Sequence, residues 1–312
     1  MTDEIAKTAI EQAAARIAPH VRRTPLIDLA AGTFEGIAHP LTLKLECLQV
    51  TASFKPRGAF NRMLSAVVPA SGVIAASGGN HGIAVAHAAR TLGHRAEIFV
   101  PEVISPAKVA RLKELGAAVN IVGKVYADAL AASQKRAAET GALVLHAYDQ
   151  PEILAGQGTV AREFEEQAAG LDTVIVAVGG GGLIGGMAAW YRGATKLIAV
   201  EPRTSRALDA ALQEGRPVDV DVSGVAADSL GARRIGALMF PLARRFVERI
   251  VLVDDAEIVA AQKALWRAVR IVAEPGGAAA MAAVLSGRYA PAPGERVGVL
   301  VCGANCDPGS VA

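Results

Sequence analysis

The stretch "TVIVAVGGGGLIGGMAAWY", residues 173–191, joins an apolar β-branched run to a cluster of glycines and a second apolar segment. It carries no charge, is nearly long enough to cross a bilayer, and has the G-x-x-x-G spacings of a membrane helix dimer. Six glycines in eight positions would make a poor helix, however. A buried strand, a glycine turn and a helix fit the pattern better, which predicts part of a parallel sheet in a soluble α/β protein rather than a membrane span.

Similar apolar runs alternate with helix-length segments along most of the chain. Ser105 followed by Pro106 predicts a helix start, because serine caps free N–H groups and proline fits the first turn. A long helix is expected from about Pro151. The alternation predicts doubly wound, mostly parallel sheets. We expect strands at 41–46, 72–77, 96–101, 118–123, 142–147, 173–178, 196–201, 249–254 and 296–302.

So many strands are unusual for one open sheet, and the block from about 72 to 148 has three βα units of its own. We therefore predict two domains: a large one made of residues 1–71 and 149–312, and a small inserted one made of residues 72–148. No repeat of fixed period and no low-complexity tract is found in the sequence.

The composition narrows the class of protein. The 312 residues are 52% apolar and 20% charged with a net charge of +2, which is typical of a globular protein and gives no broad basic surface for nucleic acid. The cysteines, Cys47, Cys302 and Cys306, are few and odd in number, and the first residues carry acids where a signal peptide needs bases. We expect a cytoplasmic protein that acts on small molecules.

The glycines at 178–186 can point several backbone N–H groups at one anion, which predicts a phosphorylated ligand. Gly180, Gly182 and Gly185 also match the G-x-G-x-x-G pattern of dinucleotide-binding proteins, with Glu201 about twenty residues further on. Taken alone, this segment favours an NAD-dependent oxidoreductase, and tight strand-to-helix packing without a ligand is a third explanation.

Three other segments are expected to face the same cleft. "ASGGNHG" (76–82) and "CGAN" (302–305) follow predicted strands, and ligands of open α/β folds bind beyond the carboxyl ends of strands. "ASFKPRGAF" (52–60) places Lys55 at the head of a helix, where its amine can form a Schiff base with an aldehyde.

"SFKPRGAF", "SGGNHG", "GGGGLIGG", "EPGGAAA" and "CGAN", in this order, resemble segments of the pyridoxal-phosphate enzymes of the threonine/serine dehydratase and serine racemase group. The resemblance extends from about residue 20 to 306 and explains five segments where the dinucleotide pattern explains one. It implies the two-lobed α/β fold of fold type II, pyridoxal 5'-phosphate as cofactor, an amino acid as substrate, and a homo-oligomer, commonly a dimer.

The resemblance also implies roles for single residues. Lys55 carries the cofactor as a Schiff base, Phe54 packs against its ring, and Asn80 hydrogen-bonds the ring hydroxyl. Cys302 lies beside the pyridine nitrogen as a neutral group, and Glu274 lies near the same ring edge. The cofactor phosphate is held by Gly179, Gly180, Gly181 and Gly182, and the substrate carboxylate by Ser77, Gly78, Gly79, Asn80 and His81.

Structural explanations remain open for several of these residues. Ser77 and Asn80 suit turns and helix starts, and Glu274 can cap the helix that follows it. His81 can pack at a helix start, and Cys302 can be a small buried apolar residue.

The expected reaction is removal of water and ammonia from a β-hydroxy amino acid, L-threonine or L-serine, to give a 2-oxo acid. Related racemases place a serine where this chain has Gly78, which favours elimination over racemisation. Serine racemase, 3-hydroxyaspartate ammonia-lyase and a noncatalytic sensor of a phosphorylated ligand remain alternatives. Relatives that bind a divalent metal have an aspartate six residues after the counterpart of Glu201; here Ala207 stands at that spacing and Asp209 follows later, so we predict no metal site.

Overall fold

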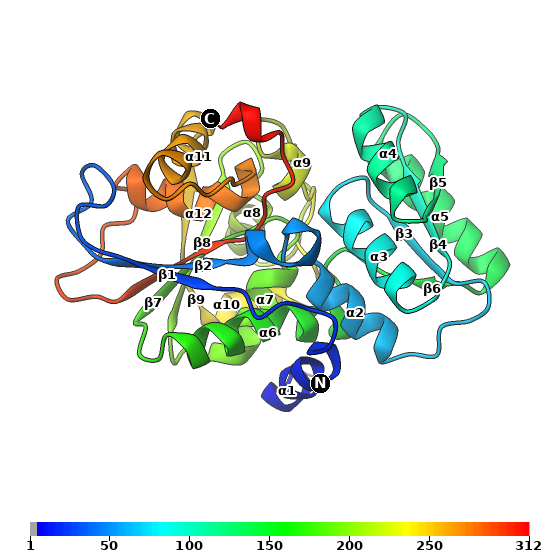
Figure 1. The fold of residues 1–312 in the computed structure, drawn as a ribbon, viewed down its shortest axis with the longest axis horizontal. Helices are drawn as coiled ribbons and strands as arrows, with labels where there is room; N and C mark the ends of the chain where they lie inside the picture. The colour runs from blue at the N-terminus through cyan, green and yellow to red at the C-terminus, as the bar shows by residue number, and fades with distance from the viewer. Residues whose placement is uncertain (1–4, 312) are drawn as a thin grey trace.

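The computed structural model describes residues 5–311, which form two β-sheets with helices packed on them (Figure 1). In the larger sheet β1 pairs with β2 in antiparallel orientation, and every other pair is parallel. From edge to edge, this sheet consists of β1 (Leu26–Leu29), β2 (Leu41–Leu45), β10 (Val297–Val301), β7 (Thr173–Ala177), β8 (Lys196–Pro202) and β9 (Val247–Val253).

The smaller sheet is parallel throughout and lies beside the larger part of the molecule, at the right in Figure 1. Its strands, in spatial order, are β5 (Ala118–Ile121), β4 (Ala96–Val100), β3 (Val73–Ala76) and β6 (Leu143–Val144). The helices between them are α3 (Asn80–Thr91), α4 (Pro106–Glu114) and α5 (Tyr126–Thr140). The strand and helix alternation predicted from the sequence is confirmed, and β2 to β10 each correspond to a predicted strand.

The larger part carries the remaining helices. Several begin with proline in the first turn, where its missing N–H costs no hydrogen bond, and α11 begins with a capping box between Asp254 and Glu257. These helices are α1 (Lys7–Ile17), α2 (Pro56–Leu64), α6 (Pro151–Gln167), α7 (Gly182–Tyr191), α8 (Ala207–Glu214), α9 (Ala227–Leu230), α10 (Phe240–Phe246), α11 (Asp255–Val269) and α12 (Pro275–Leu285).

Helix α6 packs backbone to backbone against two other helices. A Cβ atom on Gly156 would lie 2.6 Å from the carbonyl oxygen of Arg57 in α2. A Cβ atom on Gly186 of α7 would lie 2.5 Å from the backbone nitrogen of Gly158. Any larger residue at these positions would push the helices apart, so the glycines fix α2 and α7 at a close distance on either side of α6.

Each sheet has a buried apolar core, but the two cores do not divide cleanly by sequence. The core of the smaller sheet includes Ile98 and Val100 together with Phe60 and Met63 of α2. Helix α2 therefore contributes to the core of the smaller sheet although it precedes residue 72. The domain boundaries at 72 and 148 stay a prediction.

The carboxyl ends of the parallel strands bring the predicted site segments together. In the larger sheet β10 lies between β2 and β7, and the segments that follow these strands contain Cys302, Lys55 and the 179–182 glycines. In the smaller sheet β3 leads directly into the loop 77–81. Within residues 5–311, no helix is long and apolar enough to cross a membrane, so a membrane span at 173–191 is not supported.

Candidate active site

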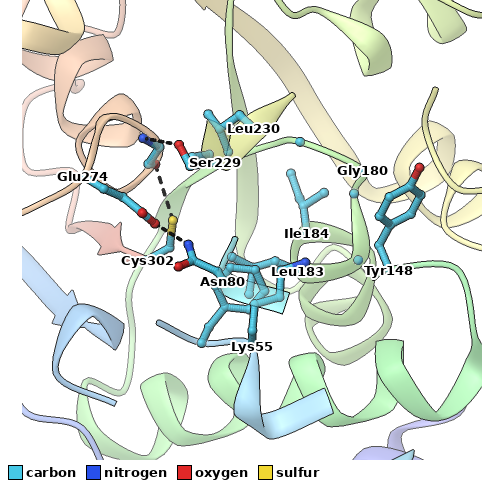
Figure 2. Close-up of a pocket in the computed structure, with 16 residues that line it drawn as sticks. Lys55, Asn80, Tyr148, Gly180, Leu183, Ile184, Ser229, Leu230, Glu274 and Cys302 are labelled. Atoms are coloured by element: carbon cyan, nitrogen blue, oxygen red, sulfur yellow. Dashed lines mark hydrogen bonds between the residues drawn. The ribbon is translucent and has the colours of Figure 1, made fainter. Parts of the chain in front are cut away.

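Two adjoining cavities lie between the sheets. The larger is an open cleft of about 690 Å³, lined from the smaller sheet by the loop 77–81 and from the larger part by residues 227–234. The smaller cavity lies deeper, and Lys55, Asn80 and Tyr148 line both (Figure 2). Every residue predicted for the site lines one cavity or the other.

Lys55 stands at the head of α2, directly before Pro56. Its Nζ donates a hydrogen bond to the carbonyl oxygen of Ala147 at 2.8 Å and lies 5.1 Å from the centre of the Phe54 ring. Burial lowers the pKa of this amine to about 8, and the acidic groups of Cys302 and Glu274 oppose the shift. A large fraction of the amine is thus neutral, and able to act as nucleophile or base, near pH 8.

The segment before Lys55 is tied to the end of β10. The Phe54 N–H donates to the Cys302 carbonyl at 3.2 Å, and the Ala304 N–H donates to the Ala52 carbonyl at 2.9 Å. Thr51 and Ala52 both have positive φ angles, of 64° and 56°, which is uncommon for residues other than glycine. These bonds hold a strained turn in place and thereby fix Lys55 relative to Cys302.

The glycine loop 179–182 also lines the inner cavity. Gly181 is the N-cap of α7 with φ +87°, and the N–H groups of the first turn of a helix have no carbonyl partner within it. A Cβ atom on Gly180 would lie 2.2 Å from the ring of Tyr148, so no larger residue fits there. The loop is therefore a set of backbone donors at the positive end of a helix, which suits a phosphate.

Asn80 connects the two sides of the cleft. Its Nδ2 donates to Glu274 Oε1 at 2.5 Å (Figure 2), and its Oδ1 accepts from Asn305 Nδ2 at 2.6 Å. Glu274 occupies the N-cap position of α12, but its side chain makes no capping bond and is directed to Asn80 instead. Burial raises the pKa of Glu274 to about 7, against the effect of the Asn80 bond.

Cys302 is buried at the end of β10. Its Sγ donates to the carbonyl oxygen of Gly276 at 3.4 Å, and the Gly276 N–H donates to Ser229 Oγ at 3.0 Å. Burial raises the pKa of the thiol, so Cys302 is neutral in the physiological range. It contributes a neutral polar group to the inner cavity.

Two other side chains of the segment 77–81 bond the segment itself and the residue that follows β6. Ser77 Oγ accepts from the Gly79 N–H at 3.2 Å, which is the turn contact expected of serine. The His81 Nε2 lies 3.0 Å from the Leu145 carbonyl, and burial lowers the pKa of this ring to about 3. His81 is therefore neutral and donates to a backbone oxygen, which favours the packing explanation for it.

Comparison with known proteins identifies the family. The family model described as pyridoxal-phosphate dependent enzyme matches residues 17–303. The chain belongs to the pyridoxal-phosphate-dependent enzymes. Its cofactor is pyridoxal phosphate, and it has the fold type II architecture of this family.

Relatives of this pyridoxal-phosphate enzyme include both dehydratases and racemases. It is 37% identical over 305 residues to an L-threonine ammonia-lyase of Geobacter sulfurreducens, covering 96% of this chain and 75% of the relative. Maize serine racemase superposes with a TM-score of 0.90 at 32% identity, over 98% of this chain and 95% of that one. A threonine deaminase of T.th. gives a TM-score of 0.89 at 33% identity, over 97% and 99%. The enzyme thus acts on amino acids, and the similarity alone does not separate dehydration from racemisation.

The inner cavity fits the cofactor. An aldehyde needs an amine of lowered pKa, and Lys55 supplies one at the cavity wall. A phosphate needs several donors, and the loop 179–182 with the first turn of α7 supplies them. Both line a single cavity, as a ligand that carries an aldehyde and a phosphomethyl group on one ring requires.

Glu201, which the dinucleotide pattern singled out, has a different role. Its carboxylate is fully buried and accepts from the N–H groups of Leu208 and Asp209 at 2.8 and 2.9 Å. It therefore binds the first turn of α8 and lines neither cavity. Across residues 5–311, no three His, Cys, Asp or Glu side chains are grouped so that they could hold a metal ion.

Several residues of the site were not predicted from the sequence. Tyr148 packs on the glycine loop, and its hydroxyl donates to the Arg234 carbonyl at 3.1 Å. Asn305, within the quoted "CGAN", bonds both Asn80 and the Thr51 carbonyl. Tyr148 directly follows the predicted strand 142–147, so its position at a strand end was a usable signal. No sequence signal distinguished Ser229.

Proposed function

We propose that this enzyme is an ammonia-lyase that eliminates water from a β-hydroxy amino acid, L-threonine or L-serine, after which hydrolysis of the product, which consumes one water, releases ammonia and a 2-oxo acid. One observation carries the proposal: the cleft has an amine of lowered pKa on one wall, at Lys55, and a residue without a side chain, Gly78, on the other. Elimination needs one base, whereas inversion of the α-carbon needs a second proton-transferring group on the other wall.

Residues of the inner cavity bind and orient the cofactor in this proposal. Lys55 Nζ attaches it covalently, and the N–H groups of Gly179, Gly180, Gly181 and Gly182 bind its phosphate. Phe54 and Asn80 contact its ring. Cys302 would lie near the ring nitrogen, and Glu274 would act through Asn80, whose amide it orients. When bound, the cofactor withdraws electrons from the α-carbon of the substrate, which makes its proton acidic.

Side chains of the protein would then accept the α-proton of the substrate and hold its carboxylate. As a free amine, Lys55 would accept the α-proton at Nζ, because its lowered pKa keeps a useful fraction of the amine neutral near pH 8. The Gly78 N–H and the hydroxyl of Ser77 would bind the substrate carboxylate, and the Gly79 N–H, which donates to Ser77 Oγ, would hold that hydroxyl in place. A neutral thiol at Cys302 does not fix a proton on the ring nitrogen as a carboxylate would, which favours rapid loss of the β-hydroxyl.

Racemisation is the second candidate, because of the similarity to maize serine racemase. It requires a proton donor on the wall that faces Lys55. In this proposal the Ser77 hydroxyl binds the substrate carboxylate, His81 bonds the Leu145 carbonyl, and position 78 has no side chain. We therefore place racemisation second, and a homo-oligomer, most simply a dimer, remains part of the proposal.

A substrate panel tests the proposed reaction. The purified enzyme with its cofactor is incubated with L-threonine, L-serine, D-serine and 3-hydroxyaspartate. Release of 2-oxo acid and of ammonia is measured, and the enantiomers of the remaining substrate are separated by chiral chromatography. We expect 2-oxo acid release to exceed racemisation by at least about tenfold, a difference of about 1.4 kcal/mol in barrier. Racemisation at a rate equal to or above elimination would contradict the proposal.

Reduction with borohydride tests the attachment site. The enzyme should show a visible absorption band that borohydride bleaches, with the reduced cofactor recovered on the peptide that contains Lys55. Label on any other lysine would contradict the assignment of Lys55. Light scattering of the same preparation gives the oligomeric state.

A further inference from the structure

The space next to Gly78 is filled by another side chain. Gly78 follows β3 and Ile104 follows β4, its neighbour in the smaller sheet, so the two loops lie side by side at the same sheet edge (Figure 1). A Cβ atom on Gly78 would lie 2.5 Å from Ile104 Cδ1 and 3.5 Å from Val100 Cγ1. Ile104 therefore occupies the volume that a side chain at position 78 would enter.

Ile104 is held in this place by its surroundings. Its side chain is half-buried and packs against the core of the smaller sheet, of which Val100 is a fully buried member. Its N–H donates to the Pro101 carbonyl at 3.1 Å, which closes a turn before α4. Both Gly78 and Ile104 line the open cleft together with Lys55. An aliphatic side chain thus covers the part of the cleft wall where position 78 lies.

We propose that Ile104 is a specificity-determining residue, which restricts the enzyme to elimination by excluding a proton donor from position 78. This inference rests on the proposed function, in which Lys55 accepts the α-proton. Inversion requires that one proton passes to Lys55 Nζ and another reaches the α-carbon from the opposite wall. The donor recovers its proton from water, so no further reactant is consumed. With Ile104 in place, a serine at position 78 would have to displace the end of the isoleucine side chain before its hydroxyl could point into the cleft.

Four proteins test the contact itself: the unmodified enzyme, Gly78→Ser, Ile104→Ala and the double variant. The free energy of unfolding of each holoenzyme is measured in urea at one fixed cofactor concentration, so that cofactor binding contributes equally. The end of the isoleucine side chain can rotate, so Gly78→Ser should still fold. We expect Gly78→Ser to lower the unfolding midpoint when Ile104 is present and to have a smaller effect when position 104 is alanine. Equal effects in both backgrounds would show that Ile104 does not fill this space.

The same proteins test the effect on the reaction. Racemisation of L-serine, and exchange of its α-hydrogen in D₂O, are measured beside 2-oxo acid release. We expect the double variant Gly78→Ser/Ile104→Ala to racemise at least about tenfold faster than Gly78→Ser alone. The matched control Gly78→Ala/Ile104→Ala, which opens the same space without a hydroxyl, should show no gain.

The outcomes separate this inference from the proposed function. Equal racemisation by Gly78→Ser and the double variant would overturn the inference, and so would a double variant that folds and gains nothing. If the unmodified enzyme released no 2-oxo acid from any substrate, the proposed function would fail, while the unfolding measurements would still decide whether Ile104 fills the space at position 78.

Discussion

The two walls of the cleft are held in place by different kinds of contact. Behind Lys55, Arg57 binds Glu46 through two hydrogen bonds of 2.7 and 2.8 Å, and both side chains are buried. In the smaller sheet, Arg136 binds Glu97 with the same two-bond geometry at 3.0 and 3.1 Å, but the arginine side chain is 46% exposed. The arginine–glutamate pair behind the wall that carries Lys55 is thus buried, whereas the corresponding pair behind the other wall lies at the surface.

The burial of these ion pairs indicates which wall of the cleft is held more firmly. Glu163 joins the buried pair through a 3.0 Å contact with Arg57 and also binds Lys44, so that α2 is locked to β2 and α6. The facing wall is made of loops after β3 and β4, supported by apolar contacts and by an ion pair between Lys108 and Asp228 across the cleft. The reactive amine thus lies on the wall held by buried ion pairs, which we call the rigid wall. The wall that carries Gly78 and Ile104 is held by apolar contacts and an exposed ion pair, and we call it the softer wall.

Lys55→Ala should have the largest effect, because it removes the amine that the rigid wall holds. We expect turnover to fall by roughly 10⁴-fold or more, with the fold preserved, since the lysine side chain borders a cavity and makes a single hydrogen bond. Activity is measured as 2-oxo acid release and folding by circular dichroism. Normal turnover in a folded variant would place the reactive amine elsewhere.

Arg57→Met tests whether the buried pair is the stronger anchor. Removing the arginine leaves Glu46 buried without a cation, although Glu163 keeps Lys44, and this costs about 3–5 kcal/mol of unfolding free energy. The matched variant is Arg136→Met, which breaks the exposed pair and should cost at most about 1 kcal/mol. Urea unfolding of both variants measures the difference, and equal costs would remove the contrast between the walls.

The raised pKa of Glu274, which lies where the two walls meet, predicts that the free energy of unfolding depends on pH. Its pKa is raised to about 7 in the folded state, so the folded protein binds this proton more tightly than the unfolded chain does. The associated stability is complete below pH 4.5 and is lost as the pH rises towards 7, by roughly 3 kcal/mol.

Glu274→Gln should therefore flatten the decrease in unfolding free energy between pH 4.5 and 7. The control Glu139→Gln changes an exposed carboxylate of α5 and should leave the pH profile as it is. The midpoints of urea unfolding are measured at several pH values in this range. If stability still decreases with pH in Glu274→Gln, the pH dependence belongs to other groups.

Lys108→Ala removes the ion pair that spans the cleft. Its partner, Asp228, is 85% exposed, so the expected loss of stability is at most about 1 kcal/mol and should shrink further in 0.5 M salt. A loss as large as that of Arg57→Met would mean that the softer wall is held as firmly as the other.

Cys302→Ser should have the smallest effect, although the residue lies on the rigid wall. Serine is also neutral and can donate to the Gly276 carbonyl, so kcat/KM should stay within about threefold, or about 0.6 kcal/mol. Cys302→Asp replaces the thiol by a charged side chain of similar size, and it should change the absorption spectrum of the cofactor and reduce turnover. Inactivity of the serine variant would show that the thiol itself is required.

Most of the fold could be predicted from the sequence because its strands are buried and parallel. Runs such as Thr173–Ala177 are apolar throughout and flanked by helix-length segments, which gives a strong local signal. β1 was missed because it is a short edge strand with Asp28 exposed, and it is ordered by pairing with β2, not by its own pattern. The residue pattern of a single strand does not show which strand it pairs with.

The site could be predicted where its residues follow one another in the chain. The glycine loop and the loop 77–81 are contiguous segments at strand ends, so their place in the cleft followed from topology. The Ile104 contact with Gly78 joins two loops, and the Asn305 bond to Asn80 joins residues 225 apart. Such pairs depend on how the sheets come together in space, for which the sequence has no local pattern.

The close packing of α6 has a consequence for engineering. Its glycines set the spacing between α2 and α7, and the first turns of these two helices carry the amine and the phosphate loop. Because peptide groups determine this distance, redesign of side chains around the cleft opening should leave it unchanged. A laboratory search for new substrates can therefore vary the loop after β4, provided that Gly156, Gly158, Gly186 and the binding residues 77–80 are kept.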